Sequence, residues 1–402
     1  MTAAPTRAVM AALGGEEDRA RFVGGAVRNA LLGVPVIDVD IATQFTPDDV
    51  VRRLHAAKLR AVATGIEHGT VTAIADGTAF EVTSLRRDVE TFGRRAVVAF
   101  TTEWTEDALR RDFTINALYA SADGNLFDYF NGLEDIAARR VRFIGDANQR
   151  IREDYLRILR FFRFYAWYGR GTPDTAAITA CVAEKSGIKL LSGERVQKEL
   201  LLLLQAQNPV PVLTLMQENG ILEEFLPGEL HTGRVERLIG IEREIGAAPD
   251  VLLRFAALLP DSAAQARGIG HTLRLSNEAR DRIVAAAERD RRIAAPMPPA
   301  LAKQLLYRNG VERFHDQLLL NWAGSGASPG DSNWRAIFSL MQSWKIPQLP
   351  VDGNDVMALG IPEGPEIGVR LRDVEQWWIE QDFAAGRMEL LDRLRDTVHK
   401  PR

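Results

Sequence analysis

Two aspartates separated by one residue, Asp38 and Asp40, are the side chains of this sequence best suited to hold metal ions. The apolar run around them predicts a strand over residues 35–41, on which both carboxylates project from one face because strand side chains alternate. Side-by-side carboxylates repel each other unless a cation neutralises them, and Mg2+ commonly links one or two carboxylates to substrate phosphates. Two such ions about 4 Å apart can activate a hydroxyl and stabilise a leaving pyrophosphate. For an isolated Asp-x-Asp pair, the alternative is a solvated strand edge.

A pair of glycines, Gly24-Gly25, precedes the acid pair and opens a predicted helix that carries Arg28. Paired glycines allow close approach of a ligand to the backbone, and the N–H groups at a helix start attract anions. Arg28 could add a charge-assisted contact to phosphate. An isolated Gly-Gly is usually a plain turn, but its position within 17 residues of the acid pair favours a combined phosphate and metal site.

A second group of charged residues lies on a helix predicted over residues 151–168. Helical spacing places five of its side chains on one half of the circumference: Glu153, Asp154, Arg157, Arg160 and Arg163. An acceptor at Asp154 beside a donor fork at Arg157 can match the Watson–Crick edge of cytosine or adenine. Uracil and guanine present a carbonyl where those bases carry an amino group, so Asp154 would repel them. The alternative is an ordinary salt-bridged surface helix.

The elements that must position these residues change in type along the chain. The first 130 residues predict strands at 22–23, 35–41, 69–74, 79–83 and 126–130, with helices near 26–32, 47–57 and 105–119. From about residue 150 helical spacing dominates, at 151–168, 192–206, 233–246, 274–293, 298–309 and 365–382. The sequence therefore predicts an α+β head followed by a nearly all-helical remainder.

Composition is consistent with a multidomain protein of the cytoplasm. The chain has 402 residues, of which 46% are hydrophobic, and its formal net charge is −4. That net charge is mild evidence against a nucleic-acid enzyme, but nine arginines lie between residues 139 and 170, and such a local positive field suits a polyphosphate or RNA. No apolar stretch is long enough to span a membrane, and residues 1–13 do not resemble a secretory signal. The single cysteine, Cys181, excludes an intramolecular disulfide.

Several motifs in order make the sequence resemble the bacterial and eukaryotic class of CCA tRNA nucleotidyltransferases, which also contains bacterial poly(A) polymerases. The resemblance is strong over about residues 20–205 and weaker at 355–368. The motifs are Gly24-Gly25-Ala26-Val27-Arg28, Asp38-Val39-Asp40, Arg110-Arg111-Asp112-Phe113-Thr114-Ile115-Asn116-Ala117, residues 127–136, Glu153-Asp154-Tyr155-Leu156-Arg157, and Ser192-Gly193-Glu194-Arg195 with Glu199.

This resemblance implies a head with a five-stranded mixed sheet and helical neck, body and tail. The expected boundaries are 1–140 for the nucleotidyltransferase head, 141–205 for the neck with its base-selecting helix, 206–330 for the body and 331–402 for the tail. The expected substrates are ATP, CTP and a tRNA held by its acceptor and T arms, with two Mg2+ ions. No membrane and no protein partner is implied.

The resemblance also assigns roles to individual residues. Asp38 and Asp40 would hold the catalytic metals, and the expected nucleotide-binding residues are Gly24, Gly25, Arg28, Arg111, Asp112, Asn116, Asp154, Arg157, Arg160 and Arg163. Within that set, Gly25 and Arg28 would hold the triphosphate, Asp112 and Asn116 the ribose, and Asp154 and Arg157 the base. Glu153 would orient Arg157, and the segment 192–199 would stabilise the neck helices.

Three features qualify the expectation. Asn29 stands where the family usually has Asp, and Glu81 is a candidate accessory carboxylate, against a simple exposed strand acid. The segment 88–104 would be a loop involved in the change from C to A addition, or an ordinary mobile loop.

The alternatives to full CCA addition are a poly(A) polymerase, a CC-only or A-only enzyme, and an inactive RNA-binding relative. Histidines with zinc-like spacing are absent, which disfavours a second hydrolase activity.

Overall fold

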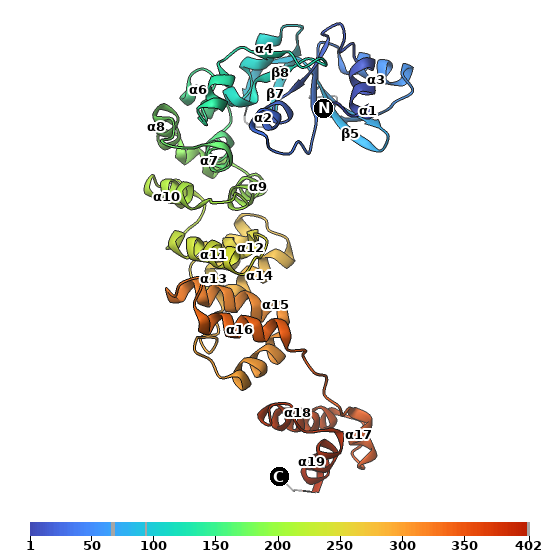
Figure 1. Cartoon of the computed structure of the whole chain (residues 1–402), viewed down its shortest axis with the longest axis vertical. Coiled ribbons are helices and arrows are strands. Elements are labelled where there is room, and N and C mark those ends of the chain that lie inside the picture. The colour runs from blue at the N-terminus through green and yellow to red at the C-terminus, as the bar shows by residue number, and fades with distance from the viewer. Residues whose placement is uncertain (66–68, 93–94, 400–402) are drawn as a thin grey trace. The chain divides into compact units, whose positions relative to one another are not determined.

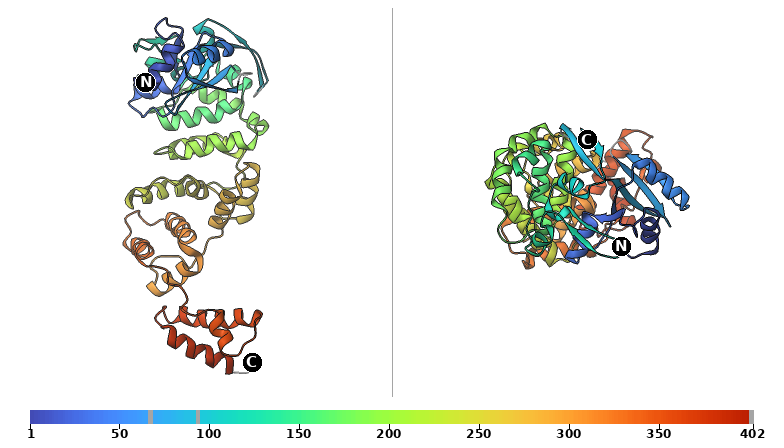
Figure 2. Two further views of the ribbon diagram at one scale, coloured as in Figure 1. Left: turned by 90° about the vertical axis from the view of Figure 1, so that its right-hand side faces the viewer. Right: turned by 90° about the horizontal axis from the view of Figure 1, so that it is seen from above.

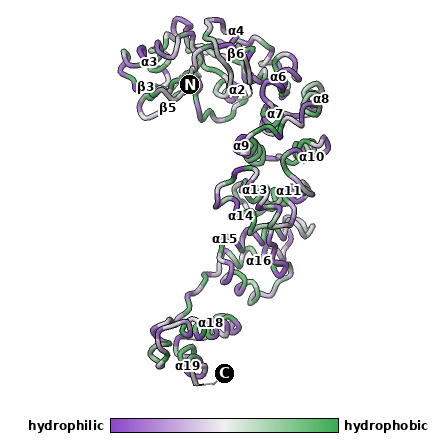
Figure 3. The backbone as a smooth tube through the Cα atoms, turned by 180° about the vertical axis from the view of Figure 1, so that it is seen from behind, coloured by the Kyte–Doolittle hydropathy of each residue, from purple (hydrophilic) through white to green (hydrophobic). Residues whose placement is uncertain are grey.

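The computed structural model describes residues 1–65, 69–92 and 95–399 (Figure 1). These residues divide into two compact units. Unit 1 comprises residues 1–227 with 272–275, and unit 2 comprises residues 228–271 with 276–402. Hydrophobic and hydrophilic positions are interspersed along both units (Figure 3). None of the helices in the described residues is both long and apolar enough to cross a membrane.

Unit 1 begins with a mixed sheet and the helices around it. The strands are β1 (Ala20–Val23), β2 (Asp40–Thr43), β3 (Arg60–Gly65), β4 (Thr70–Ala75), β5 (Thr78–Ser84), β8 (Leu118–Ala120) and β9 (Leu126–Asp128), in the order β3-β4-β5-β2-β1-β8-β9. β2 pairs in parallel with β5, and the other neighbouring strands are antiparallel. The helices of this part are α1 (Ala4–Ala12), α2 (Gly25–Leu32), α3 (Pro47–Ala56), α4 (Trp104–Leu109) and α5 (Gly132–Ala137), with a 3₁₀ turn at Thr114–Asn116.

The predicted fold class is confirmed, but the sheet has seven strands rather than five. β3 was missed because Arg60-Ala61-Val62-Ala63-Thr64-Gly65 is rich in alanine, which has low strand propensity. β8 was missed because residues 105–119 were predicted as one helix, whereas α4 ends at Leu109 and the chain then re-enters the sheet. The predicted strand at 35–41 is also shorter, since β2 begins only at Asp40.

The segment 88–104 is largely strand rather than loop. β6 (Arg86–Phe92) and β7 (Arg95–Phe100) form a separate antiparallel pair, with Arg86 opposite Phe100. Gly93 and Arg94 lie outside the described residues. The described residues on either side of those two positions therefore form an antiparallel strand pair, and not the loop expected from the sequence.

The rest of unit 1 is helical (Figure 2). Its elements are α6 (Ala147–Glu153), α7 (Leu156–Tyr168), α8 (Thr175–Ala183), a 3₁₀ helix at Lys185–Leu190, α9 (Gly193–Leu204), α10 (Val210–Glu218) and a 3₁₀ turn at Leu222–Glu224. α7 buries Leu156, Ile158, Leu159, Phe161, Phe162 and Phe164, which leaves its arginines on the opposite side. α7 packs on α9 and α10.

Unit 2 is entirely helical in its described part. Its helices are α11 (Thr232–Glu244), α12 (Val251–Leu258), α13 (Ala263–Thr272), α14 (Asn277–Ala287), α15 (Pro299–Ser325), α16 (Ser332–Ser343), α17 (Gly353–Ala358), α18 (Pro365–Glu380) and α19 (Arg387–His399). The predicted end of a helix at residue 309 corresponds to a break inside α15, where Gly310 has φ +75°. One core cluster of this unit gathers Val356, Val374, Trp378, Leu390 and Leu394.

Candidate active site

A cleft of about 840 Å3 in unit 1 gathers the predicted site residues from elements far apart in the sequence. Its lining consists of Gly24, Gly25, Arg28, Asp38, Asp40, Arg86, Arg110, Arg111, Asp112, Asn116, Asp154, Leu156, Arg157, Arg160, Arg163, Phe164, Arg195, Lys198, Glu199 and Leu202. All twelve residues predicted to hold metal or nucleotide are in this set, whereas Glu81 and Glu153 are not. Nine basic and five acidic side chains line the cleft, so it carries an excess of positive charge suited to a polyphosphate.

The acid pair lies at the N-terminal end of strand β2. Asp40 is the first residue of the strand and stands directly opposite Glu81 of β5, while Asp38 lies in the bend before it. Burial, and then the negative charges of Glu81 and Asp38, raise the pKa of Asp40 above its ordinary value, although Arg111 and Arg28 oppose the shift. These carboxylates therefore repel one another in the way that a bound cation would relieve. The described residues contain no cluster of three or more His, Cys, Asp or Glu side chains arranged around a metal position.

The glycine pair forms the turn from β1 into α2. Gly24 has φ +63°, a backbone conformation that residues other than glycine rarely adopt. Its N–H donates to the Leu118 carbonyl oxygen over 3.2 Å. A Cβ atom on Gly24 would lie 3.5 Å from Arg111 Nη1 and 3.6 Å from the Asn116 carbonyl oxygen. The turn thus brings the backbone close to the side chain of Arg111.

Arg111 is held by two residues that sequence analysis missed, Asp107 and Tyr119. Its Nη2 donates to Asp107 Oδ2 over 3.0 Å, and the Tyr119 hydroxyl donates to the same oxygen over 2.7 Å. Burial alone would raise the pKa of Asp107, but Arg111, Arg110 and Tyr119 hold that pKa well below its usual value. An acid at 107 on the predicted helix gave a weak signal, whereas nothing in the sequence indicated that Tyr119 of β8 would meet it.

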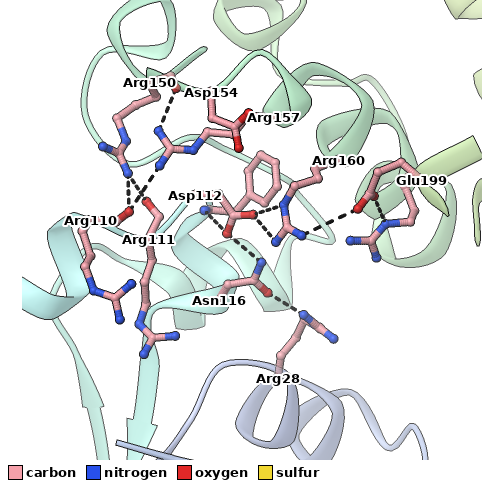
Figure 4. A network of polar contacts seen from close by, with 12 residues as sticks. Arg28, Arg110, Arg111, Asp112, Asn116, Arg150, Asp154, Arg157, Arg160 and Glu199 are labelled. Atoms are coloured by element: carbon pink, nitrogen blue, oxygen red, sulfur yellow. Dashed lines mark hydrogen bonds and ion pairs between the residues drawn. The ribbon is translucent and has the colours of Figure 1, made fainter. Parts of the chain in front are cut away.

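A continuous polar network connects the two sides of the cleft (Figure 4). Asp112 Oδ1 accepts from the Phe113 N–H over 2.9 Å and from Asn116 Nδ2 over 3.0 Å. Its other oxygen accepts from Arg160 Nε and Nη2 over 2.7 and 2.5 Å. Burial would raise the pKa of Asp112, but Arg160 and Asn116 lower it to about 2.

On α9, Glu199 extends this network. It is buried, it accepts from Arg163 Nε, and it lies 3.8 Å from Arg160 Nη1. Two of the predicted nucleotide-binding arginines are therefore fixed in place by a carboxylate of the segment 192–199. That contact joins α7 to α9, as expected for a segment that stabilises the helices.

The segment 151–168, predicted as one helix, is two helices in the structure. α6 ends at Glu153, Asp154 is extended with φ −155°, and α7 begins at Leu156. The break arises because Asp154 Oδ1 accepts from the Leu156 N–H over 3.2 Å and so starts a new helix. Asp154 and Arg157 are therefore brought together by a turn rather than by continuous helical spacing.

Both members of this pair are held by neighbours. Asp154 Oδ2 accepts from Arg195 Nη2 over 2.6 Å, which adds a residue of α9 that was not predicted to touch the base site. Arg157 Nη1 donates to Glu153 Oε2 over 2.5 Å and to the Arg150 carbonyl oxygen over 2.7 Å. Glu153 thus contacts Arg157 from outside the cleft lining. Arg150 in turn donates to Glu153. It also donates to the carbonyl oxygens of Arg110 and Arg111 (Figure 4).

Known proteins similar to this chain match it over most of its length. Residues 20–142 match the family described as "Poly A polymerase head domain", and residues 172–230 match "Probable RNA and SrmB- binding site of polymerase A". The mitochondrial CCA tRNA nucleotidyltransferase 1 of Mus musculus is 34% identical over 395 residues, which cover 95% of this chain and 88% of the relative. The CCA-adding enzyme of Levilactobacillus brevis is 33% identical, with 89% and 88% covered.

A solved structure with a similar fold is that of the Bacillus stearothermophilus CCA-adding enzyme in complex with CTP. It superimposes with a TM-score of 0.75 at 28% identity and covers 99% of each chain. The similarity therefore extends through both units and is not limited to the residues of the cleft.

Proposed function

The chain belongs to the family of CCA tRNA nucleotidyltransferases, and on that premise we propose that it adds C, C and A to the 3′ end of tRNA from CTP and ATP. In each addition the 3′-oxygen of the tRNA forms a bond to the α-phosphorus, the bond from that phosphorus to the bridging oxygen of the β-phosphate breaks, and pyrophosphate leaves. The proton of the 3′-hydroxyl passes to solvent. The observation that carries this proposal is a single cleft whose lining contains the acid pair, the Gly24-Gly25 turn with its arginines, and the Asp154/Arg157 pair.

Asp38 and Asp40 are the residues that would hold two Mg2+ ions. Their carboxylates are hard oxygen ligands. Burial, and then the negative charges of Glu81 and Asp38, raise the pKa of Asp40, and a divalent cation would neutralise that group of charges. When bound, such ions supply charge stabilisation for the attacking and leaving oxygens. Glu81 faces Asp40 across the parallel strand pair and is the candidate accessory carboxylate.

The triphosphate is assigned to the Gly24-Gly25 turn with Arg28, and Arg111 adds a second guanidinium. Arg111 approaches Gly24 closely, so a phosphate at the turn would lie within reach of both arginines. Asp112 and Asn116 are assigned to the ribose. Because both oxygens of Asp112 already accept two hydrogen bonds, we propose that Asp112 acts mainly by fixing Asn116 and Arg160.

Selection of the base is assigned to Asp154 and Arg157. Asp154 accepts from the amino group of cytosine or adenine, and Arg157 donates to the acceptor beside that amino group. Glu153, Arg150 and Arg195 hold these two side chains, and Arg160 and Arg163 support the nucleotide from α7. The pair rejects uracil and guanine because their carbonyl oxygens would face the Asp154 carboxylate.

We propose that the four predicted segments have separate tasks. Head (1–140) and neck (141–205) lie in unit 1 and contain the cleft, while most of the body (206–330) and the whole tail (331–402) lie in unit 2. We assign the acceptor and T arms of tRNA to body and tail. A structure with the same fold at 17% identity is described as a Thermotoga maritima CCA-adding enzyme complexed with tRNA.

For the compartment we propose the cytoplasm, supported by a single cysteine that is buried. Relatives from mouse and human are named mitochondrial, so cell fractionation is the measurement that decides the compartment.

The deciding experiment uses tRNA that ends before the CCA sequence, together with each labelled NTP alone and then all four. The proposal predicts two C additions with CTP, one further A when ATP is also present, and no product with UTP or GTP. A long A tract on tRNA and on unrelated RNA would show the poly(A) polymerase alternative, which the match to a poly(A) polymerase head domain keeps in view. Addition that stops at CC, or that requires a CC end, would show a partial enzyme, and no addition at all would show an inactive relative.

A further inference from the structure

Arg28 differs from most neighbouring arginines because, among the described residues, its guanidinium is hydrogen-bonded to neutral groups and not to a carboxylate. Its guanidinium is buried and donates to three neutral acceptors. Nε and Nη2 donate to Asn29 Oδ1 over 3.1 and 2.9 Å, Nη1 donates to Asn116 Oδ1 over 2.5 Å, and Nη2 donates to the Tyr168 hydroxyl over 2.9 Å. The same guanidinium lies 4.2 Å from the centre of the Tyr168 ring. Asn29, Asn116 and Tyr168 are called the neutral cradle below.

Neighbouring arginines of the cleft form ion pairs with carboxylates. The pairs are Arg110 and Arg111 with Asp107, Arg157 with Glu153, Arg160 with Asp112, Arg163 with Glu199, and Arg195 with Asp154. For Arg28, no carboxylate within ion-pair distance is found in residues 1–65, 69–92 and 95–399. A buried cation that lacks a counter-charge is costly, so it is suited to an anionic ligand that arrives later.

Burial, helped by the charge of Arg163, lowers the pKa of Arg28 against the opposing effects of Tyr168 and Asp112. This shift has the direction expected for a cation that lacks a carboxylate partner. It agrees with the contact pattern, which by itself identifies Arg28 as a cation without an acidic partner.

Asn29 has a second contact that an acid in its place could not make. Its Nδ2 donates to the Pro35 carbonyl oxygen over 3.3 Å, in the segment that leads to Asp38. An amide can accept from Arg28 and donate to Pro35 at once, whereas a carboxylate only accepts. Asn29 therefore fixes Arg28 relative to the segment that carries the first metal-binding aspartate.

Tyr168 ties the same arginine to the helix that selects the base. It lies at the end of α7, and Arg157 lies near the start of that helix. Its hydroxyl accepts from Arg28 Nη2, the nitrogen that also donates to Asn29, and its ring lies against the same guanidinium. A single helix thus contacts both the phosphate-binding and the base-selecting parts of the cleft.

We propose that the neutral cradle keeps Arg28 as an uncompensated charge for the triphosphate, with Asn29 and Tyr168 acting as positioning residues. This inference rests on the proposed function, because it concerns the phosphate part of the same cleft. It goes further in assigning a role to Asn29 as an amide and in making a helix of the neck part of phosphate binding.

The test compares Asn29→Asp with wild type in three measurements: KM and kcat for CTP and ATP on tRNA, the affinity for inorganic tripolyphosphate without tRNA, and thermal stability. A carboxylate at this position would neutralise Arg28, so KM and the tripolyphosphate Kd should each rise on the order of 10-fold while kcat changes less. Thermal stability should change little, because the new ion pair with Arg28 offsets the loss of the hydrogen bond from Asn29 to the Pro35 carbonyl. A merely structural role predicts instead that binding falls only together with stability.

Tyr168→Phe is the second variant, since it removes the hydroxyl but keeps the ring over Arg28. It should raise the tripolyphosphate Kd by about 3-fold, in line with the loss of one hydrogen bond to a charged donor that retains other partners. The matched control is Asn277→Asp on the surface of unit 2. In the wild type Arg280 Nη2 donates to Asn277 Oδ1 over 2.7 Å, so the substitution also places a new carboxylate beside an arginine. This control should leave tripolyphosphate affinity unchanged.

The outcomes separate this inference from the proposed function. Wild-type affinity for tripolyphosphate in both Asn29→Asp and Tyr168→Phe would overturn the cradle, whether or not the chain adds CCA. If both variants bind tripolyphosphate more weakly than wild type, and the wild-type chain adds no nucleotide to tRNA, the cradle is supported and the proposed function is rejected.

Discussion

The substitution Asp112→Asn tests whether the network across the cleft holds unit 1 together as well as the nucleotide. Asp112 accepts four hydrogen bonds, two of them from Arg160, and its pKa is lowered from 3.8 to about 2. Since one pKa unit corresponds to about 1.4 kcal/mol, the ionised carboxylate stabilises the folded state by about 2 kcal/mol at pH 7. Because the amide of Asn would also face the donors of Arg160, the total loss should be about 2–4 kcal/mol.

The pH dependence of this loss has a definite sign. A carboxyl whose folded-state pKa is depressed contributes its full stability above the unfolded-state value near 3.8, and the contribution disappears as the pH falls through about 2. Roughly half of the carboxylate contribution should remain at pH 3. The difference between wild type and Asp112→Asn should therefore shrink between pH 7 and pH 3.

The assay is urea unfolding followed by near-ultraviolet circular dichroism at both pH values, with hydrogen exchange of peptides from 113–120 assigning the transition to unit 1. The matched control is Asp392→Asn, which removes an exposed acid that pairs with Arg395 over 2.8 Å and should change stability by less than about 1 kcal/mol. The reasoning is refuted if Asp112→Asn costs no more than this control, or if its cost is the same at pH 3 as at pH 7.

Further predictions concern the chemistry and the base. Asp40→Ala should abolish nucleotide addition while the folded state keeps or gains stability, because the cost of burying the Asp40 carboxylate and its repulsion from Glu81 and Asp38 are removed; turnover at the wild-type rate would reject the metal assignment. Arg157→Ala should lower the preference for C and A over U and G by on the order of 10- to 100-fold, with less effect on tripolyphosphate affinity; unchanged selectivity would count against the Asp154/Arg157 pair. Tyr119→Phe should raise KM for both nucleotides by about 5-fold through loss of the hydrogen bond that fixes Asp107 against Arg111, and a KM equal to wild type would show that Arg111 needs no such support.

The acid pair and the glycine turn could be predicted because their signals are local. Gly24 needs a positive φ, and Asp38 and Asp40 follow each other within three residues of one segment, so sequence order nearly fixes their proximity. The strand itself was predicted too long, because the apolar residues of 35–39 satisfy strand propensity without pairing to a neighbouring strand.

The break before α7 was not predictable from periodicity. The apolar residues continue in almost the same phase across Asp154, so the pattern resembles one helix. α6 ends where the Asp154 side chain accepts hydrogen bonds from the Leu156 N–H and from Arg195. Arg195 lies 41 residues further along the chain. Such tertiary competition is invisible in a local window.

The supporting residues of the site were missed for the same reason. Asp107 and Tyr119 lie on different elements, and their meeting depends on a strand, β8, that was assigned to a helix. Tyr168 ends a helix whose aromatic residues all fit an interpretation as core, so its hydroxyl gave no signal of a contact with Arg28. The family resemblance supplied the candidate site residues, but the side chains that contact them become apparent only in the folded structure.

The most direct test of the central claim is a crystal structure with CTP and Mn2+, in which anomalous scattering locates the metal. The account predicts metal peaks about 2.2 Å from carboxylate oxygens of Asp38 and Asp40, a triphosphate that contacts Arg28, and a cytosine edge on Asp154 and Arg157. Metal bound away from both aspartates, or CTP bound with its base remote from α7, would contradict it.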